Sequence, residues 1–113
     1  ANELDRRGIV YTREYSVSRY SIDFALVNIK IAVECDGRGW HYTPRQRAHD
    51  RRRDAFLAGL GWHVFRYGQN AIEQNVSLCV DNLIAKLNIL GLDPPTGEQN
   101  RVFTRQLKLP GLG

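Results

Sequence analysis

The sequence contains no methionine and only two cysteines, Cys35 and Cys79, among its 113 residues. Two isolated cysteines provide neither the paired spacing of a zinc ribbon nor the several bridges of a disulfide-stabilised scaffold. We therefore expect two free thiols in a reducing compartment. The missing initiator methionine predicts that the chain begins inside a longer product or after processing, which leaves room for a targeting segment or a further domain before Ala1.

Long hydrophobic runs are also absent. No apolar run approaches the roughly 20 residues that a membrane-spanning helix needs, so the sequence excludes a membrane span. Hydrophobic residues make up 42% and charged residues 25% of the chain, as in an ordinary soluble domain. At this length we expect one domain over residues 1–91. An extended tail over residues 92–113 should follow it, because prolines and glycines gather there.

Acidic residues are nearly missing from one stretch of a chain whose net charge is +4. Between positions 38 and 53, six arginines accompany the single acid Asp50, which gives this stretch a local charge of +5. The six are Arg38, Arg45, Arg47, Arg51, Arg52 and Arg53. Arginine binds phosphate through two parallel hydrogen bonds, and Trp40, His41 and Tyr42 lie within the stretch. The pattern favours a nucleic-acid partner over its alternative, a solvated helix face.

Alternating apolar residues predict a small sheet. Strands are expected at positions 9–15 and 20–27, and a nearly continuous apolar run at 29–35 is typical of a buried central strand. Positions 62–67 predict a fourth strand. The first three strands can pair as a meander, whereas the fourth must return through a helical crossover. The order predicts an α/β fold, with a small mixed sheet of about four strands flanked by helices.

Helix boundaries are marked by local signals. Thr43 followed by Pro44 predicts a helix from Pro44 to about residue 60 that stops at Gly61. Asn75 predicts the cap of a last helix with one apolar stripe, which ends at Gly91. Residues 1–7 are interpreted as the end of a helix before Gly8.

Three acidic residues occupy the predicted strands. Asp23 interrupts the second strand, while Glu34 and Asp36 end the central one and project to the same face because they are two residues apart. A buried carboxylate is costly unless it is paired, protonated or bound to a cation. Hard cations such as Mg²⁺ prefer oxygen ligands, so the three acids predict a cation site. The alternative is pairing with nearby arginines, for example Arg66.

His41 follows a glycine-rich loop just beyond the acidic strand end, and Asp50 lies on the next predicted helix. A carboxylate that accepts a hydrogen bond from one imidazole nitrogen fixes the tautomer and leaves the other nitrogen as a base. The alternative is an exposed loop histidine and an Asp50 paired with Arg47 or Arg53. His49 and His63 are interpreted as structural.

These residues also occur in a familiar order. The ordered set comprises Asp23-Phe24, Val33-Glu34-Cys35-Asp36-Gly37, Trp40-His41, Asp50-Arg51-Arg52-Arg53-Asp54 and Leu60-Gly61-Trp62-His63-Val64. Over residues 8–67 the sequence resembles the PD-(D/E)XK nuclease superfamily, with the very-short-patch-repair endonucleases as the nearest branch. Their relatives include phage homing endonucleases with a Glu-Asp-x-His-Asp signature. The resemblance implies a restriction-endonuclease-like fold.

The resemblance implies a role for each matching residue. Asp23 corresponds to a metal-binding catalytic Asp, and Glu34 and Asp36 to the first and last positions of the (D/E)XK element. Asp36 stands where many members of the superfamily carry Lys. Cys35 lies where the repair enzymes use a backbone carbonyl as a metal ligand. The acidic residue that the family carries on its first helix has no match, since Glu3 lies too near the first strand and Glu14 lies within it.

His41 corresponds to the catalytic general base and Asp50 to the residue that orients it. The phosphate contacts would come from four arginines, Arg38, Arg45, Arg51 and Arg52. Together these roles imply a Mg²⁺-dependent DNA endonuclease in the cytoplasm of a bacterial or phage-infected cell. A further DNA-binding domain and a second copy of the chain are candidate partners. Two alternatives stay open: a catalytically inactive nucleic-acid-binding module of the same fold, and a structural domain whose acids pair with arginines.

Overall fold

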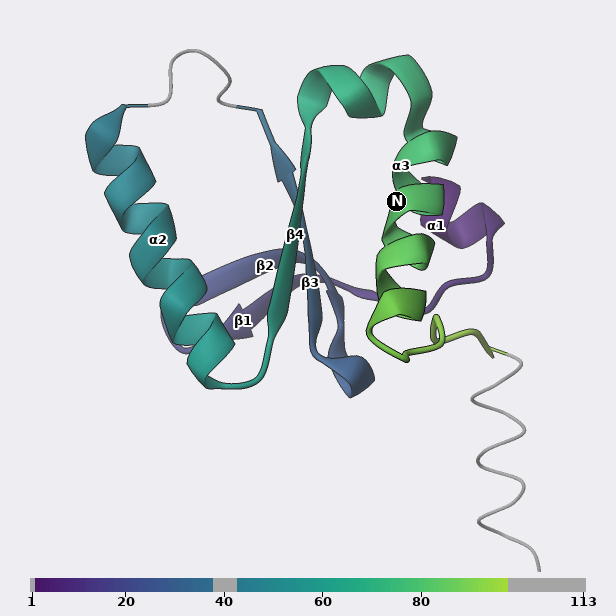
Figure 1. The fold of residues 1–113 in the computed structure, drawn as a ribbon, viewed down its shortest axis with the longest axis horizontal. Helices are drawn as coiled ribbons and strands as arrows, with labels where there is room; N and C mark the ends of the chain where they lie inside the picture. Colours follow the sequence, from purple (N-terminus) through teal and green to yellow (C-terminus); the bar gives the residue numbers. More distant parts are fainter. Residues whose placement is uncertain (1, 38–42, 98–113) are drawn as a thin grey trace, which may run out of the picture.

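The computed structural model describes residues 2–37 and 43–97 (Figure 1). Its elements are α1 (Asn2–Arg6), β1 (Thr12–Val17), β2 (Tyr20–Leu26), the 3-10 helix η1 (Val27–Ile29), β3 (Ile31–Asp36), α2 (Pro44–Gly59), β4 (His63–Gly68) and α3 (Gln69–Ile89). The predicted general base His41 and the predicted phosphate contact Arg38 lie outside the described residues, as does the tail beyond residue 97. Within the described part, none of the helices has the length and apolar character to cross a membrane.

The four strands form one sheet in the order β1-β2-β3-β4. The pairs β1–β2 and β2–β3 are antiparallel, and β3 and β4 are parallel because α2 carries the chain back between them. This arrangement confirms the predicted α/β fold with a mixed sheet flanked by helices. Figure 1 shows β3 and β4 nearly edge-on between α2 on one side and α3 on the other.

Alternate residues of β3 pack into two hydrophobic clusters on opposite faces of the sheet. On the α3 face the buried members are Leu4, Ile9, Leu26, Ile31, Val33, Val80, Leu83 and Leu87. On the α2 face they are Ile22, Ala25, Ala32, Leu57 and Trp62. Helix α2 contributes Leu57 alone to this second cluster, and its other buried residues are the charged Asp50 and Arg53. The inner face of α2 is therefore held largely by polar contacts.

The start of α2 follows its sequence signal. Thr43 Oγ1 accepts a hydrogen bond from the Gln46 backbone nitrogen at 3.2 Å, and Gln46 Oε1 accepts one from the Thr43 backbone nitrogen at 2.8 Å. This reciprocal capping box, with Pro44 at the first helical position, satisfies backbone donors that the helix itself leaves without partners. The helix end is equally well marked, because Gly61 adopts a left-handed conformation with φ of +92°.

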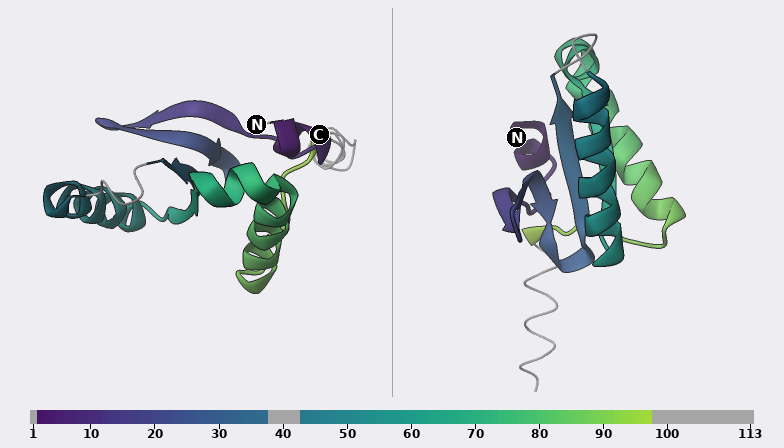
Figure 2. Two further views of the ribbon diagram at one scale, coloured as in Figure 1. Left: turned by 90° about the horizontal axis from the view of Figure 1, so that it is seen from above. Right: turned by 90° about the vertical axis from the view of Figure 1, so that its left-hand side faces the viewer.

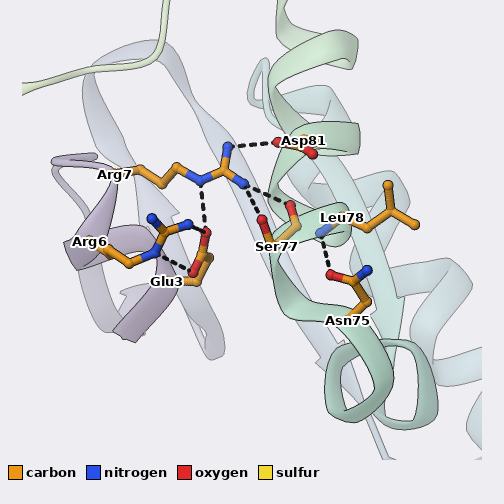
Figure 3. Close-up of polar contacts among 7 residues, drawn as sticks. All are labelled: Glu3, Arg6, Arg7, Asn75, Ser77, Leu78 and Asp81. Carbon is orange, nitrogen blue, oxygen red and sulfur yellow. Dashed lines mark hydrogen bonds and ion pairs between the residues drawn. The ribbon is translucent and has the colours of Figure 1, made fainter.

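The expected start of the last helix at Asn75 is corrected by the structure, because α3 begins at Gln69. Asn75 forms a kink inside the helix, with φ of −162° and ψ of 83°. Its Oδ1 accepts a hydrogen bond from the Leu78 backbone nitrogen at 3.0 Å, so it caps the second segment as an N-cap residue does (Figure 3). The first segment was missed because residues 69–74 carry no continuous apolar stripe.

The starts of two strands also differ from the expectation by two residues or more. β1 begins at Thr12 rather than at position 9, and Ile9 instead forms an isolated bridge with Thr96. β3 begins at Ile31 because η1 precedes it and Lys30 turns the chain with φ of 54°. Both cysteines are free thiols, as expected.

Candidate active site

At one end of the sheet, side-chain hydrogen bonds replace the backbone pairing between β2 and β3. The last residue pair in their backbone register is Phe24–Val33. Beyond it, the Asp23 backbone nitrogen donates to Glu34 Oε2 at 3.2 Å, and the Cys35 backbone nitrogen donates to Asp23 Oδ2 at 2.9 Å. Each carboxylate thus binds the backbone of the opposite strand. The two acids are fixed side by side by the fold of the sheet itself.

Strand β1 is distorted at the same level. Glu14 has a φ of 51°, a left-handed conformation that residues with a side chain rarely adopt. It lies between the pairs Arg13–Phe24 and Tyr15–Ile22, which places it opposite Asp23. Regular pairing of β2 is therefore interrupted on both sides of Asp23.

A cleft of about 410 Å³ opens next to these acids. It is lined by Ser21, Asp23, Glu34, Cys35, Asp36, Gly37, His49, Asp50, Arg53 and Arg66. The structure therefore brings Asp23 of β2 and Glu34 and Asp36 of β3 together with Asp50 of α2. The predicted phosphate contacts Arg45, Arg51 and Arg52 do not line the cleft; they are exposed on α2.

Arg53 is a site residue that the sequence analysis missed. Its side chain is only 9% exposed, and its Nη2 donates to the Ser21 carbonyl at 2.8 Å and to Glu34 Oε1. Arg53 thereby connects α2 to both β2 and β3. The only sequence signal is its position three residues after Asp50, which places both side chains on one face of the helix.

Arginine pairing of the acids, the alternative to a cation site, is thus realised for Glu34, although with a different partner. Arg66 pairs instead with Asp54 of α2 through Nη2 and Oδ1 at 2.8 Å. His49, which is interpreted as structural from the sequence, lines the same cleft. Which side of α2 faces the cleft could not be read from a helix with so few apolar residues.

Burial is the main influence on the pKa of Glu34. It raises the pKa of this carboxyl group because the charged form loses solvation, and the Arg53 guanidinium opposes the rise. Burial likewise raises the pKa of the Cys35 thiol, with a smaller contribution from Asp23. The Cys35 thiol therefore lacks the lowered pKa that is typical of a reactive thiolate.

The donor atoms of the cleft suit a hard divalent cation. Mg²⁺ is commonly held by one or two carboxylates, with water and substrate oxygens completing its coordination. Asp23 and Glu34 provide two adjacent carboxylates, and Asp36 lines the same cleft. Across residues 2–37 and 43–97, no group of three or more histidine, cysteine or acidic side chains is arranged to hold a metal ion. The residues present therefore fit a cation bound through one or two carboxylates, and not an all-protein cage.

Glu3, the acidic residue of α1, is held away from this cleft. It accepts hydrogen bonds from Arg6 Nε at 2.9 Å and from Arg7 Nε at 2.8 Å (Figure 3). Arg7 also donates to the Ser77 side chain at 2.8 Å and pairs with Asp81 at 2.7 Å, both on α3. These arginines lower the pKa of Glu3 to about 2. Glu3 therefore serves to dock α1 on α3.

The chain is similar in sequence to a known family and to uncharacterised bacterial proteins. The sequence model of the REase_MTES_1575 family matches residues 1–87. The uncharacterised protein YcjD of Escherichia coli is 35% identical over 78 residues, which is 69% of this chain and 64% of that protein. An uncharacterised protein of Haemophilus influenzae is 29% identical over 76 residues, 67% of this chain and 62% of that protein. The chain thus spans a little under two thirds of the length of these relatives.

A solved structure supports the fold. The catalytic domain of the homing endonuclease I-Bth0305I superposes with a TM-score of 0.60, covering 75% of this chain and 88% of that domain. The two sequences are 22% identical. At this level of identity the likeness shows a common restriction-endonuclease-like fold.

Proposed function

This chain belongs to the REase_MTES_1575 family, a family of restriction-endonuclease-like proteins, and from that premise we propose that it is a Mg²⁺-dependent DNA endonuclease domain. The observation that carries the proposal is the cleft, where Asp23, Glu34 and Asp36 meet Asp50 of the arginine-rich helix α2. Carboxylates at the end of a sheet provide hard oxygen ligands, and the surrounding arginines provide affinity for phosphate.

Asp23 and Glu34 would hold the cation, together with the backbone carbonyl of Cys35. When bound there, Mg²⁺ would polarise the scissile phosphodiester and stabilise the leaving oxygen. Asp36 would add a further carboxylate next to the reacting group. Arg53 would keep Glu34 in place, since it binds one carboxylate oxygen while the other accepts from the Asp23 backbone.

Proton transfer would fall to His41 and Asp50. His41 would take a proton from the attacking water, and the Asp50 carboxylate would orient the imidazole and fix its tautomer. The role of His41 is supported by the family resemblance alone, because the residue lies outside the described part of the chain. The role of Asp50 gains support from its buried position in the wall of the cleft.

DNA would be held by the exposed arginines of α2. Arg45, Arg51 and Arg52, with Arg38 before the helix, would contact phosphates on either side of the cleavage site. Such contacts position a duplex without reading its sequence. Sequence specificity would then come from other parts of the full-length protein, such as a further DNA-binding domain or a second copy of the chain.

The test uses supercoiled plasmid incubated with the protein in Mg²⁺ or in EDTA. We expect nicked or linear product only with Mg²⁺. The variant Asp23→Asn should retain plasmid in a mobility-shift lane and yield no product, because the amide keeps the hydrogen bond to Cys35 but loses the charge that holds the cation. Cleavage by Asp23→Asn at the wild-type rate would contradict the assignment of this residue.

A catalytically inactive nucleic-acid-binding module is the second candidate, and the Arg53–Glu34 pair favours it, because the guanidinium already neutralises the carboxylate. This candidate predicts retention of the plasmid with a steep salt dependence and no Mg²⁺-dependent product. A purely structural domain predicts neither retention at moderate salt nor product. The same gel therefore separates the three functions.

A further inference from the structure

One flank of α2 carries basic and aromatic residues together. Arg45, His49, Arg52 and Phe56 are spaced by four, three and four residues and form a single stripe along the helix. We call these four residues the α2 stripe. It extends over roughly 16 Å, at 1.5 Å of helix per residue.

The α2 stripe faces the first residue of β2. The ring of Tyr20 lies 6.1 Å from that of His49 and 5.4 Å from that of Phe56, measured between centroids. The guanidinium of Arg19, in the turn before β2, lies 5.5 Å from the Tyr20 centroid. Figure 2 shows the end of the β1–β2 hairpin reaching toward α2. The hairpin thus adds a third arginine and a supporting aromatic ring.

Two features distinguish this flank from an ordinary solvated helix face. Phe56 is 40% exposed, whereas Tyr20 beneath it is 9% exposed, so a packed ring supports one that is open to solvent. His49 belongs both to the α2 stripe and to the wall of the acidic cleft. The surface is therefore continuous with the site where cleavage is proposed.

We propose that the α2 stripe binds a single DNA strand where it leaves the cleft, with its phosphates on the arginines and one base stacked on Phe56. This inference rests on the proposed nuclease function. Base stacking on aromatic side chains beside a positive surface is the usual basis of single-strand binding, and it requires a base that is not already stacked in a duplex. A duplex can reach the arginines but offers no free base face to Phe56.

The chain offers a matched control for charge. Arg51 and Arg52 are adjacent and both exposed, but they lie about 100° apart around the helix axis. Arg52 belongs to the α2 stripe and Arg51 does not. Replacing either with Ala removes the same charge from the same helix. Any difference between the two variants in DNA affinity therefore reports where the DNA strand binds.

The experiment measures fluorescence anisotropy of a labelled single strand, and of the same strand annealed to its complement, in EDTA. We expect Phe56→Ala to weaken single-strand binding about tenfold and duplex binding by less than about twofold. Phe56→Leu, which keeps an apolar cover over Tyr20, should also lose single-strand affinity, whereas Phe56→Trp should retain it. Arg52→Ala should weaken single-strand binding more than Arg51→Ala does. Thermal unfolding of each variant verifies that the fold is preserved.

The outcomes distinguish this inference from the proposed function. If the wild type binds neither probe at moderate salt, the proposed function itself is contradicted. If the wild type cleaves plasmid but Phe56→Ala and Phe56→Leu bind the single strand as tightly as the wild type, the α2 stripe alone is overturned. Equal losses for Arg51→Ala and Arg52→Ala would also overturn it, because they would reveal a diffuse attraction by the whole helix.

Discussion

Arg53 and Glu34 form a buried ion pair at the centre of the candidate site. Their side chains are 9% and 8% exposed, so neither charge is compensated by water. The remaining Glu34 oxygen accepts from the Asp23 backbone, and Arg53 also binds the Ser21 carbonyl. Both Glu34 oxygens and Arg53 Nη2 thus have partners, and no buried side-chain nitrogen or oxygen of the described residues lacks a hydrogen bond, which is the condition under which burying two charges is tolerated. The pair fixes α2 to the strands that carry the acids.

Removing one partner should therefore be much more harmful than removing both. We expect Arg53→Ala to lower the free energy of unfolding by about 3–5 kcal/mol, since it leaves the Glu34 carboxylate buried without compensation. The double variant Arg53→Met with Glu34→Gln should recover most of that loss. Urea unfolding measures both values. As a control, Arg52→Ala, which removes the neighbouring exposed arginine, should change the free energy of unfolding by less than about 0.5 kcal/mol. A mild effect of Arg53→Ala would show that water solvates the pair.

At the scale of single residues, the sequence predicted the acids but not Arg53, the basic partner of Glu34. Asp23, Glu34 and Asp36 were predictable because a charge within an apolar strand contradicts its surroundings. Arg53 is one of six arginines within sixteen positions, and only the rotation of α2 about its axis distinguishes it from the others. That rotation depends on Leu57 and on polar contacts with residues distant in the sequence. No local pattern contains this information.

Helix α1 is held on α3 by charge as well as by Leu4. Glu3 pairs with Arg6 and Arg7, and Arg7 reaches Ser77 and Asp81 across the interface (Figure 3). The network makes the docking of α1 sensitive to pH, because it depends on the ionised form of Glu3.

Acid should loosen this docking. The pKa of Glu3 is lowered from 4.5 to about 2 in the folded protein, so its stabilising contribution is complete above pH 4.5 and is lost as the pH falls toward 2. We expect the stability of the wild type to fall over this range more steeply than that of Glu3→Gln. Urea midpoints at several pH values, compared between the two proteins, measure the difference. Parallel curves would contradict a role for the Glu3 pairs.

The kink of α3 depends on a single side chain. Asn75 leaves the helical conformation, and its Oδ1 accepts from the Leu78 backbone nitrogen. We expect Asn75→Ala to reduce stability by about 1 kcal/mol, as for other caps, and Asn75→Ser to retain most of it. Thermal unfolding measures both. An Asn75→Ala variant as stable as the wild type would indicate that the two segments of α3 are held by packing alone.

At the scale of elements, the local signals were the informative ones. The capping box at Thr43 and the cap at Asn75 involve residues three apart, so a sequence reveals them directly. The first segment of α3 and the 3-10 helix η1 lack such signals. Each directly follows a strand, β4 in the first case and β2 in the second, so the cap of the last helix was expected seven residues too late and the start of β3 two residues too early.

At the scale of the whole molecule, the two faces of the sheet differ in the kind of residues that they bury. The α3 face holds the larger apolar cluster, to which α1, β2, β3 and α3 contribute. The α2 face has a smaller cluster, and beside it lies the acidic cleft with its buried charges. The larger apolar cluster thus lies on the α3 face, and the buried charges of the cleft, Glu34, Asp50 and Arg53, lie beside the smaller one. A cation bound in the cleft, as proposed above, would therefore leave the apolar core undisturbed.

Cation binding should consequently be visible in the stability of the whole domain, without DNA. A cation that binds only the folded state adds about 1.4 kcal/mol when its concentration is tenfold above its dissociation constant. For a domain of this size that corresponds to a rise of roughly 5 °C in the unfolding midpoint. We expect Mg²⁺ to raise the unfolding midpoint of the wild type and to leave that of Asp23→Asn unchanged. Differential scanning calorimetry at increasing Mg²⁺ concentrations and constant ionic strength measures both midpoints. Equal shifts for both proteins would place the cation elsewhere, and no shift for the wild type would contradict a cation site in the free protein.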